Sequence, residues 1–397
     1  MNLKQLQINN LLNITQAINN NVSADELYRM YQSFLSWEMG IERMALFVST
    51  DDGYECVTHH GVPEFIVRFD IGPYIKDFDK MKYIYNHENE VISEFDVVIP
   101  VFHKDRSLAF SFIGGTSGDS DLLERLQFII TITNIIAVAI ENKRLFKRQV
   151  DQEILRQEMM FAMNMQNRLM PSEFLKNKYV DIHGFYKPKL DVGGDYYDIV
   201  STSDREILLA IADISGKGVA AALLMSNIQA ILRTLIKRTR NLNEILSEIN
   251  ATIHEMLGGD RFASMFLARY DVQSQKLYYV NAGHNPPLLM NNGENEDSQL
   301  LEATSPVLGS VVALEKQEER EIDVQKGMQL LLYTDGLTEI MNQEESFFNI
   351  NIIEQLLRDN CHMDSRDVIH LLLAEARDFA AKQDFVDDLT LLTCKFL

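Results

Sequence analysis

Apolar positions along the chain separate an N-terminal part rich in hairpin patterns from a C-terminal part in which strand and helix patterns alternate. In the N-terminal part, "ERMALFVST" and "YECVTHH" predict a hairpin around the turn "DDG". The segment "DVVIPVFHKDRSLAFSFIGG" predicts a second hairpin that turns at "HKDR". Together with a helical pattern at the start of the chain, these segments predict an α+β module over residues 1–145.

A long helix is predicted from about Asp121 until Pro171, because the intervening sequence contains neither glycine nor proline. Within this helix, one face carries residues spaced three to four apart. They are Leu155, Met159, Ala162 and Leu169, with Gln166 as the one polar member. Two interpretations remain open. The segment 146–172 is either an amphipathic helix lying on one of the domains or a dimerising signalling helix. It is the best candidate for a domain boundary.

Residues 173–397 predict helices layered on a β-sandwich rather than a parallel doubly wound sheet, because long helices accompany antiparallel hairpins. The predicted strands are "YVDIHGFYKP", "YYDIV", "EILLAIADIS", the hairpin "FASMFLARYDVQSQKLYYVNAGH", "NPPLLMNN", "MQLLLYTDG" and "DLTLLTCKFL", with the turn "STSDRE" after the second. The predicted helices are "GVAAALLMSNIQAILRTLIKRT", "NLNEILSEINATIHEML" and a pair over roughly 350–382.

Composition narrows the function classes. A chain of 397 residues with 46% hydrophobic and 24% charged residues predicts two or three globular domains. A net charge of −21 argues against a nucleic-acid or anionic-membrane partner, although phosphate esters remain accessible through bound cations. The 3 cysteines are widely spaced, no signal peptide is apparent, and the apolar run 128–140 is shorter than the roughly 20 residues of a membrane span. We expect a cytoplasmic protein.

Acidic residues recur where predicted buried strands meet glycine-bearing loops, at Asp195, Asp213, Asp335 and the pair Asp387–Asp388. Each alone is explained by turn chemistry or capping. Together they suggest converging carboxylates, whose repulsion a hard cation such as Mg²⁺ or Mn²⁺ would relieve. Their spacing does not by itself show that they converge.

Competing chemistries have weaker support. The sequence has no HExxH motif, no P-loop and no G-x-S-x-G elbow. A nucleotide cyclase of the GGDEF type would need Glu-Phe after "GGD", where this chain has Tyr196 and Tyr197.

Five motifs in order carry a resemblance, namely "VGGDYYD", "IADISGKGVAAALLM", "NAGHNPPLL", "LLLYTDGLTE" and "DDLTLLT". From roughly Ala162 to the C-terminus the chain resembles the metal-dependent serine/threonine phosphatases of the bacterial sporulation and stress type, the SpoIIE and RsbU class of the PPM superfamily. The resemblance implies an α-β-β-α sandwich with a two-metal site at one edge of the sheets.

The same resemblance implies the roles of individual residues. Mn²⁺ or Mg²⁺ would be held by Asp195, Asp213, the backbone carbonyl of Ile214, Asp335 and Asp387, and these aspartates would act through a metal-activated water. Supporting roles are implied for Gly194, Asp198, Asn281, His284 and Asp388. For Asp198, Asn281 and His284, shaping the loops around the site is at least as good an interpretation as direct chemistry. The loop "DISGKG" lacks the histidine of the eukaryotic relatives, which leaves the general acid unassigned. Lys217 in this loop could act as an electrostatic helper, but a solvated lysine is the favoured interpretation.

Residues 20–148 resemble a GAF domain, most clearly in the second hairpin and the helix that follows it, and no GAF ligand is identified. We therefore expect a phosphoprotein phosphatase controlled by a GAF-like sensor, acting on a phosphorylated anti-sigma-factor antagonist as a homodimer. The main alternative is a catalytically silent phosphatase-like sensor that docks a partner protein. A nucleotide cyclase is the second.

Overall fold

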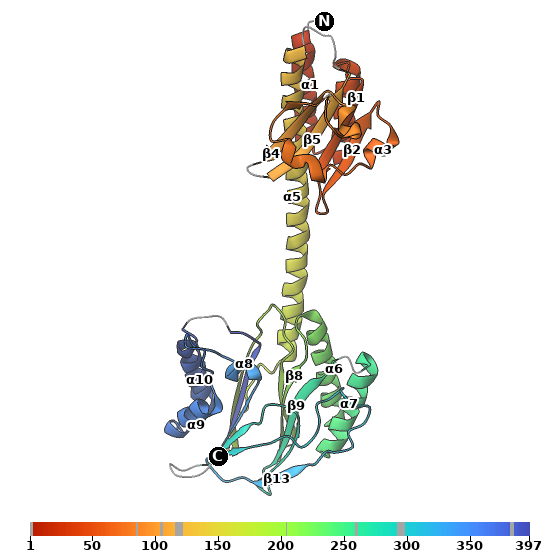
Figure 1. Ribbon diagram of the computed structural model, residues 1–397. Helices are drawn as coiled ribbons and strands as arrows, with labels where there is room; N and C mark the ends of the chain where they lie inside the picture. The colour runs from red at the N-terminus through yellow and green to blue at the C-terminus, as the bar shows by residue number, and fades with distance from the viewer. Residues whose placement is uncertain are drawn as a thin grey trace. The chain divides into compact units, whose positions relative to one another are not determined.

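The computed structural model describes residues 3–84, 86–103, 106–115, 122–203, 205–258, 261–291, 298–381 and 385–397. The chain forms two compact units, Met1–Ile154 and Leu155–Leu397, and the helix α5 (Leu122–Leu169) belongs to both (Figure 1). The division between the units falls within the predicted linker 146–172. Parts of five predictions lie outside the described residues: the helix start at Asp121, the tips of the turns "HKDR" and "STSDRE", the last residue of "NPPLLMNN", and residue 382.

The first unit contains a five-stranded antiparallel sheet with the order β2-β1-β5-β4-β3. Its strands are β1 (Arg43–Ser49), β2 (Tyr54–His60), β3 (Lys82–Tyr83), β4 (Val97–His103) and β5 (Arg106–Gly114). Both predicted hairpins are therefore present, as β1–β2 and β4–β5. The short edge strand β3 was not predicted, because two residues carry no readable alternation.

Helices cover both faces of this sheet. On one face, α1 (Leu3–Asn19), α2 (Ala24–Ser33), the π-helical turn η1 (Phe34–Glu38) and the first part of α5 enclose an aliphatic core. On the other, the short helices α3 (Glu64–Val67), η2 (Gly72–Asp77) and α4 (Glu90–Ser93) cover a core rich in phenylalanine.

Helix α5 is long and apolar enough over Arg125–Leu169 to cross a membrane by length and composition, with a mean hydropathy of 1.2 in its most apolar window. Within the protein, 44% of that window is buried. Ile129, Ile132 and Ile136 of this helix pack into the core of the first unit. Its apolar character is thus partly accounted for by packing inside a globular unit.

The second unit contains two five-stranded antiparallel sheets. The first has the order β13-β10-β9-β8-β7, with strands β7 (Tyr196–Ser203), β8 (Glu206–Ile214), β9 (Ala263–Asp271), β10 (Lys276–Ala282) and β13 (Arg320–Asp323). The second has the order β12-β11-β14-β15-β6, with strands β6 (Val180–Lys187), β11 (Leu288–Met290), β12 (Gln299–Leu300), β14 (Gln329–Tyr333) and β15 (Leu389–Phe396).

The two sheets are layered between two pairs of helices. Alternate residues of β14 point to different cores, because successive side chains of a strand face opposite sides. Leu330 and Leu332 pack with the first sheet, α6 (Val219–Leu235) and α7 (Leu242–Leu257). Leu331 and Tyr333 pack with α9 (Ile350–Asp359) and α10 (Ser365–Phe379). The predicted α-β-β-α sandwich is confirmed, and Figure 1 shows the helix pairs on the two outer sides of this unit.

Strand register positions the acidic residues. Tyr196 of β7 pairs with Ala212 of β8 in antiparallel register. Asp195, just before Tyr196, and Asp213, just after Ala212, therefore lie at the same end of one sheet. Tyr333 of β14 pairs with Leu391 of β15, which brings Asp335, at the start of α8 (Asp335–Thr338), to the same end of the other sheet as the Asp387 loop. Four segments far apart in sequence thus end side by side.

Candidate metal centre

The carboxylate of Asp195 joins the two sheets. It is 2% exposed, and the charge of the Asp213 carboxylate acts on it. Its Oδ2 accepts hydrogen bonds from Thr334 Oγ1 at 2.7 Å and from Thr390 Oγ1 at 2.6 Å. Thr390 also donates its backbone N–H to Thr334 Oγ1 at 3.0 Å, which fixes the two threonines relative to each other. These hydroxyls orient Asp195 although they belong to the opposite sheet.

Neither threonine was predicted as a site residue. A signal was present, because Thr334 directly precedes Asp335 and Thr390 lies two residues after Asp388. To recognise these threonines as site residues, one must know that the end of β14 and the start of β15 lie beside the start of β7. Strand patterns alone do not provide this.

The carboxylates raise one another's pKa. Burial, followed by the charge of Asp213, raises the pKa of Asp195. Burial raises the pKa of Asp213 to about 7, with further contributions from Asp335 and Asp387. The pKa of Asp335 is also raised, by burial and then by Glu339 and Asp387. Negative charge therefore accumulates here in a partly water-excluded place, a condition that a bound cation relieves.

Two glycines permit close approaches at this edge, one to a backbone carbonyl and one to a side chain. A Cβ at Gly194 would lie 2.7 Å from the carbonyl oxygen of Ile214. A Cβ at Gly193 would lie 2.2 Å from Asp388 Oδ2. Contacts this short exclude any side chain, so only glycine allows the loop before β7 to pass beside the Ile214 carbonyl.

The adjacent residues Asp387 and Asp388 have different environments. Asp388 accepts backbone N–H groups with both oxygens, from Lys189 at 2.8 Å and from Gly194 at 2.7 Å. Asp387 Oδ2 instead lies 2.8 Å from the ammonium of Lys217. Asp388 therefore holds the loop, whereas Asp387 faces the acidic cluster. Lys217, expected to be solvated, is half exposed but adds positive charge to that cluster.

The residues fit a hard cation in the chemistry of their donors, which are carboxylate oxygens and a backbone carbonyl. Among the described residues, however, no three His, Cys, Asp or Glu side chains are arranged as a ready set of metal ligands. The assignment of Asp195, Asp213, Ile214, Asp335 and Asp387 as ligands therefore stays a prediction.

Asp198, predicted to support the site, faces away from the cluster. It is fully buried and accepts hydrogen bonds from Tyr196 Oη at 2.7 Å, Arg233 Nε at 2.8 Å and Arg233 Nη2 at 3.0 Å. Arg233 belongs to α6, so this ion pair fastens β7 to the helix that follows the Asp213 loop. The sequence did not identify Arg233, because its partner is 35 residues away.

Asn281 and His284 shape the loop after β10. Asn281 Oδ1 accepts the His284 N–H at 2.8 Å, and Asn281 Nδ2 donates to the carbonyls of His284 at 3.1 Å and Leu301 at 3.0 Å. The His284 ring contacts Ser264 Oγ at 2.8 Å through Nδ1, and Ser264 pairs with Asp213 across the strands. Burial lowers the pKa of His284 to about 4, so the ring is neutral near pH 7.

We expect His284 to make the protein less stable in mild acid. The unfolded chain, with a histidine pKa near 6.5, binds more protons between pH 4 and 6.5 than the folded chain does. This ionisation alone lowers the stability of the fold by about 2 kcal/mol between pH 7.5 and 5, whereas the raised pKa values of the buried carboxyl groups have the opposite effect. Urea unfolding at both pH values should therefore show about 2 kcal/mol more loss in the wild type than in His284→Asn. The exposed-residue control His362→Asn should behave like the wild type, and equal pH dependence in all three proteins would contradict the assignment.

Comparison with known proteins identifies the second unit. Residues 203–397 match the family model described as Stage II sporulation protein E (SpoIIE). The phosphoserine phosphatase RsbU of Bacillus subtilis (strain 168) is 27% identical over 269 residues, which are 67% of this chain and 78% of RsbU. The phosphoserine phosphatase RsbP of the same organism is 27% identical over 170 residues, 42% of this chain and 41% of RsbP.

A solved structure supports the fold. The SiaA-PP2C domain of Pseudomonas aeruginosa superposes with a TM-score of 0.55 at 20% identity, covering 62% of this chain and 99% of that domain. The motifs, the layered sheets and these relatives agree. The C-terminal unit contains a PP2C phosphatase domain of the SpoIIE type, homologous to the serine phosphatases RsbU and RsbP.

Proposed function

We propose that this chain is a cytoplasmic, metal-dependent protein serine/threonine phosphatase that acts on a regulatory phosphoprotein under the control of its N-terminal unit. The observation that carries the proposal is the acidic cluster, in which residues from all four strand ends influence one another's pKa. Homology to RsbU and RsbP supports the reaction class.

Within the site, each residue has a distinct task. Asp195, Asp213, Asp335 and Asp387, with the Ile214 carbonyl, would hold Mn²⁺ or Mg²⁺. When bound, the ions would supply a water made nucleophilic and would stabilise negative charge on the phosphoryl group. Thr334 and Thr390 keep Asp195 in one orientation. Lys217 places a positive charge beside Asp387, where it attracts the anionic substrate.

The substrate class follows from the resemblance to the SpoIIE and RsbU class. We propose a small phosphorylated anti-sigma-factor antagonist, which would present phosphoserine or phosphothreonine. The opposite view, a silent domain that only docks such a partner, is tested by the same assay below.

Control of the site by α5 is supported by contacts at its C-terminal end. Gln166 is 4% exposed, donates Nε2 to the Gly193 carbonyl at 2.7 Å and accepts the Gly193 N–H at 3.2 Å. Gln229 of α6 donates to the carbonyl of Leu169. A shift of α5 would therefore pull on the backbone beside Gly194 and Asp195, and also on α6.

Homodimer formation is supported by an apolar stripe on α5. Phe146, Val150, Ile154 and Phe161 are exposed and lie on one side of the helix, because they are four, four and seven residues apart. Such a stripe suits packing against the same helix of a second copy.

A GAF-like sensing role for the first unit is supported by its sheet and by a cavity of about 720 Å³ lined by residues that include Tyr74, Lys82 and His87. This volume suits a small-molecule ligand. The space beneath the short helices is only about 10 Å³ and is filled by side chains that include Phe47 and Phe112.

Phosphate release tests the reaction. With Mn²⁺, the full chain should release phosphate from a phosphoserine-bearing antagonist protein and should not turn over GTP. Asp335→Asn should lower kcat/KM about 100-fold, a barrier increase of about 2.7 kcal/mol. The control Glu339→Gln, which changes an exposed neighbouring carboxylate, should stay within threefold of the wild type. Binding of the phosphoprotein without any release, in the full chain and after deletion of residues 1–145, would support the docking alternative.

Metal binding is tested by stability. In EDTA at pH 8, Asp213→Asn should be about 1–3 kcal/mol more stable than the wild type, because it removes a crowded, buried negative charge. Added Mn²⁺ should raise the melting temperature of the wild type and not of the variant. At Asp271, whose carboxylate accepts two turn N–H groups and has a lowered pKa, the change to Asn should give no stabilisation in EDTA. A variant Asp213→Asn that is destabilised in EDTA would argue against charge crowding.

The contact between α5 and the site is tested with neighbouring amides. Gln166→Ala removes both bonds to Gly193 and should lower kcat/KM about tenfold, because the loop that carries Asp195 loses an anchor. The adjacent exposed Asn167→Ala should have no effect. Equal activity of the two variants would show that the end of α5 does not influence the site.

A further inference from the structure

A second concave site lies at the other end of the β7–β8 hairpin from the acidic cluster. It has a volume of about 420 Å³, within the range of small-ligand pockets. Its walls come from the end of β7, the start of β8, and the segment that joins α6 to α7. Glu206 and Asp213 are seven residues apart on β8, or about 23 Å at the usual rise of a strand. A small ligand here would not contact the acidic cluster.

The charge of this pocket is opposite to that of the chain. Its lining includes four cationic side chains and one carboxylate, Glu206, although the chain carries a net charge of −21. The cations are Lys237, Arg238, Arg240 and Arg269. An excess of positive charge in a concavity attracts anions.

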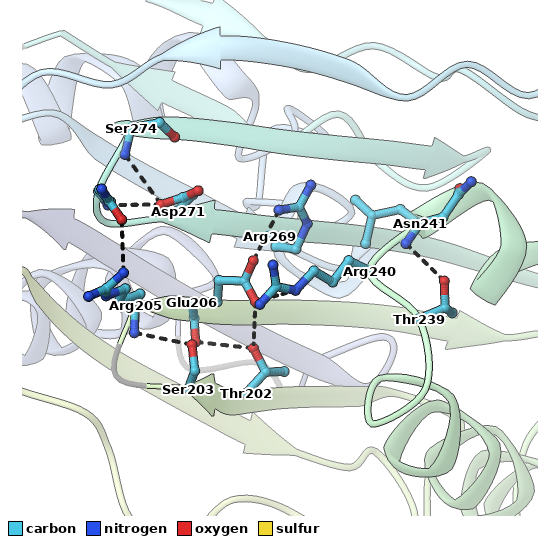
Figure 2. A network of polar contacts seen from close by, with 12 residues as sticks. Thr202, Ser203, Arg205, Glu206, Thr239, Arg240, Asn241, Arg269, Asp271 and Ser274 are labelled. Carbon is cyan, nitrogen blue, oxygen red and sulfur yellow. Dashed lines mark hydrogen bonds and ion pairs between the residues drawn. The ribbon is translucent and has the colours of Figure 1, made fainter.

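Part of this positive charge is held in place by the contacts in Figure 2. Glu206 lies between Arg240, whose Nε is 3.1 Å away, and Arg269, whose Nη1 is 3.4 Å away. Arg269 is also 3.7 Å from Glu319 and stacks on the ring of Tyr278 at 4.3 Å. The buried Glu206 thus positions two guanidinium groups in advance.

Two further cations have no such partner. The side chains of Lys237 and Arg238 are exposed and make no ion pair or hydrogen bond with the residues that the structure describes. Their position just after α6 has a simpler explanation, since cations are favoured at a helix C-terminus. That explanation does not account for Arg269, which comes from β9, or for the cavity itself.

The remaining lining defines the rest of the ligand. Apolar side chains form one wall, including Leu208, Ile236, Leu242 and Ile245. No aromatic ring is among the described residues that line the pocket, so stacking on a nucleobase does not contribute. We propose that this pocket binds a small phosphorylated organic molecule, with its phosphate on Lys237 and Arg238 and an aliphatic body against the apolar wall.

Calorimetry on the full chain in EDTA tests this site with hexylphosphonate, whose P–C bond a phosphatase does not cleave. EDTA keeps metal-dependent phosphate binding at the acidic cluster out of the measurement. We expect saturable binding of one equivalent, tighter than that of inorganic phosphate because of the apolar wall. Lys237→Ala/Arg238→Ala should weaken it about tenfold or more, since charge-assisted bonds to phosphate are lost. The control Lys178→Ala/Lys316→Ala removes the same charge elsewhere and should bind normally.

Three results would overturn the proposal: no saturable binding of either probe at millimolar concentration, unchanged binding by the Lys237/Arg238 variant, or equal weakening by the control. Binding of an acidic peptide alone, lost in the Lys237/Arg238 variant, would reassign the pocket to a protein partner. Both substituted residues are exposed and pair with no residue that the structure describes, so the variant should fold. The experiment needs neither metal nor catalysis, and its failure would leave the proposed phosphatase activity untouched.

Discussion

The burial of the Asp195 carboxylate is the constraint on which the geometry of the C-terminal unit depends. A carboxylate removed from water needs compensating hydrogen bonds, and here two of them come from Thr334 and Thr390. Asp195 belongs to the loop that enters the first sheet, whereas both threonines belong to the second. The sheets cannot slide past each other at this edge without leaving a buried charge unsatisfied. Apolar packing holds the layers together, and this polar contact sets their register.

The loop that carries Asp195 is held from three further directions. Asp388 accepts its Gly194 N–H, Gln166 is bonded to both backbone groups of Gly193, and Arg233 holds Asp198 on the strand that follows. These contacts come from the residue before β15, the end of α5 and the last turn of α6. Because all three converge on one short stretch of backbone, a displacement of any one element changes the forces on the same loop.

Much of the fold could be predicted from local patterns. The apolar runs of β1, β8, β14 and β15 are readable because nearly all of their residues are buried. Strand β2 is largely half-buried or exposed, and the turn that joins it to β1 marks it instead. The short elements β3, β12 and β13 carry too few residues to show a period. The candidate acidic residues were found through their places at strand ends and through family motifs.

The remaining site residues could not be found in this way, because their roles are defined by partners distant in sequence. Thr390 contacts a residue 195 positions away, and Gln166 contacts one 27 positions away. Asp198 was expected to support the site, either by shaping the structure around it or directly. Strand alternation and the pairing with Arg233 direct it to the α6 side, where it fastens β7 to that helix. Lys217, for which solvation and an electrostatic role were both considered, is half exposed and reaches Asp387.

The close approach of Gly194 to Ile214 has a consequence for how this domain can vary. The group that faces the loop is the main-chain oxygen of Ile214, which every amino acid possesses, so the identity of residue 214 says nothing about whether that oxygen is in place. At position 194 the identity of the residue matters, because a single methyl group there would lie 2.7 Å from that oxygen. Among homologous chains, this contact therefore requires glycine at position 194, whereas the side chain of residue 214 is constrained by packing in the core and not by this contact.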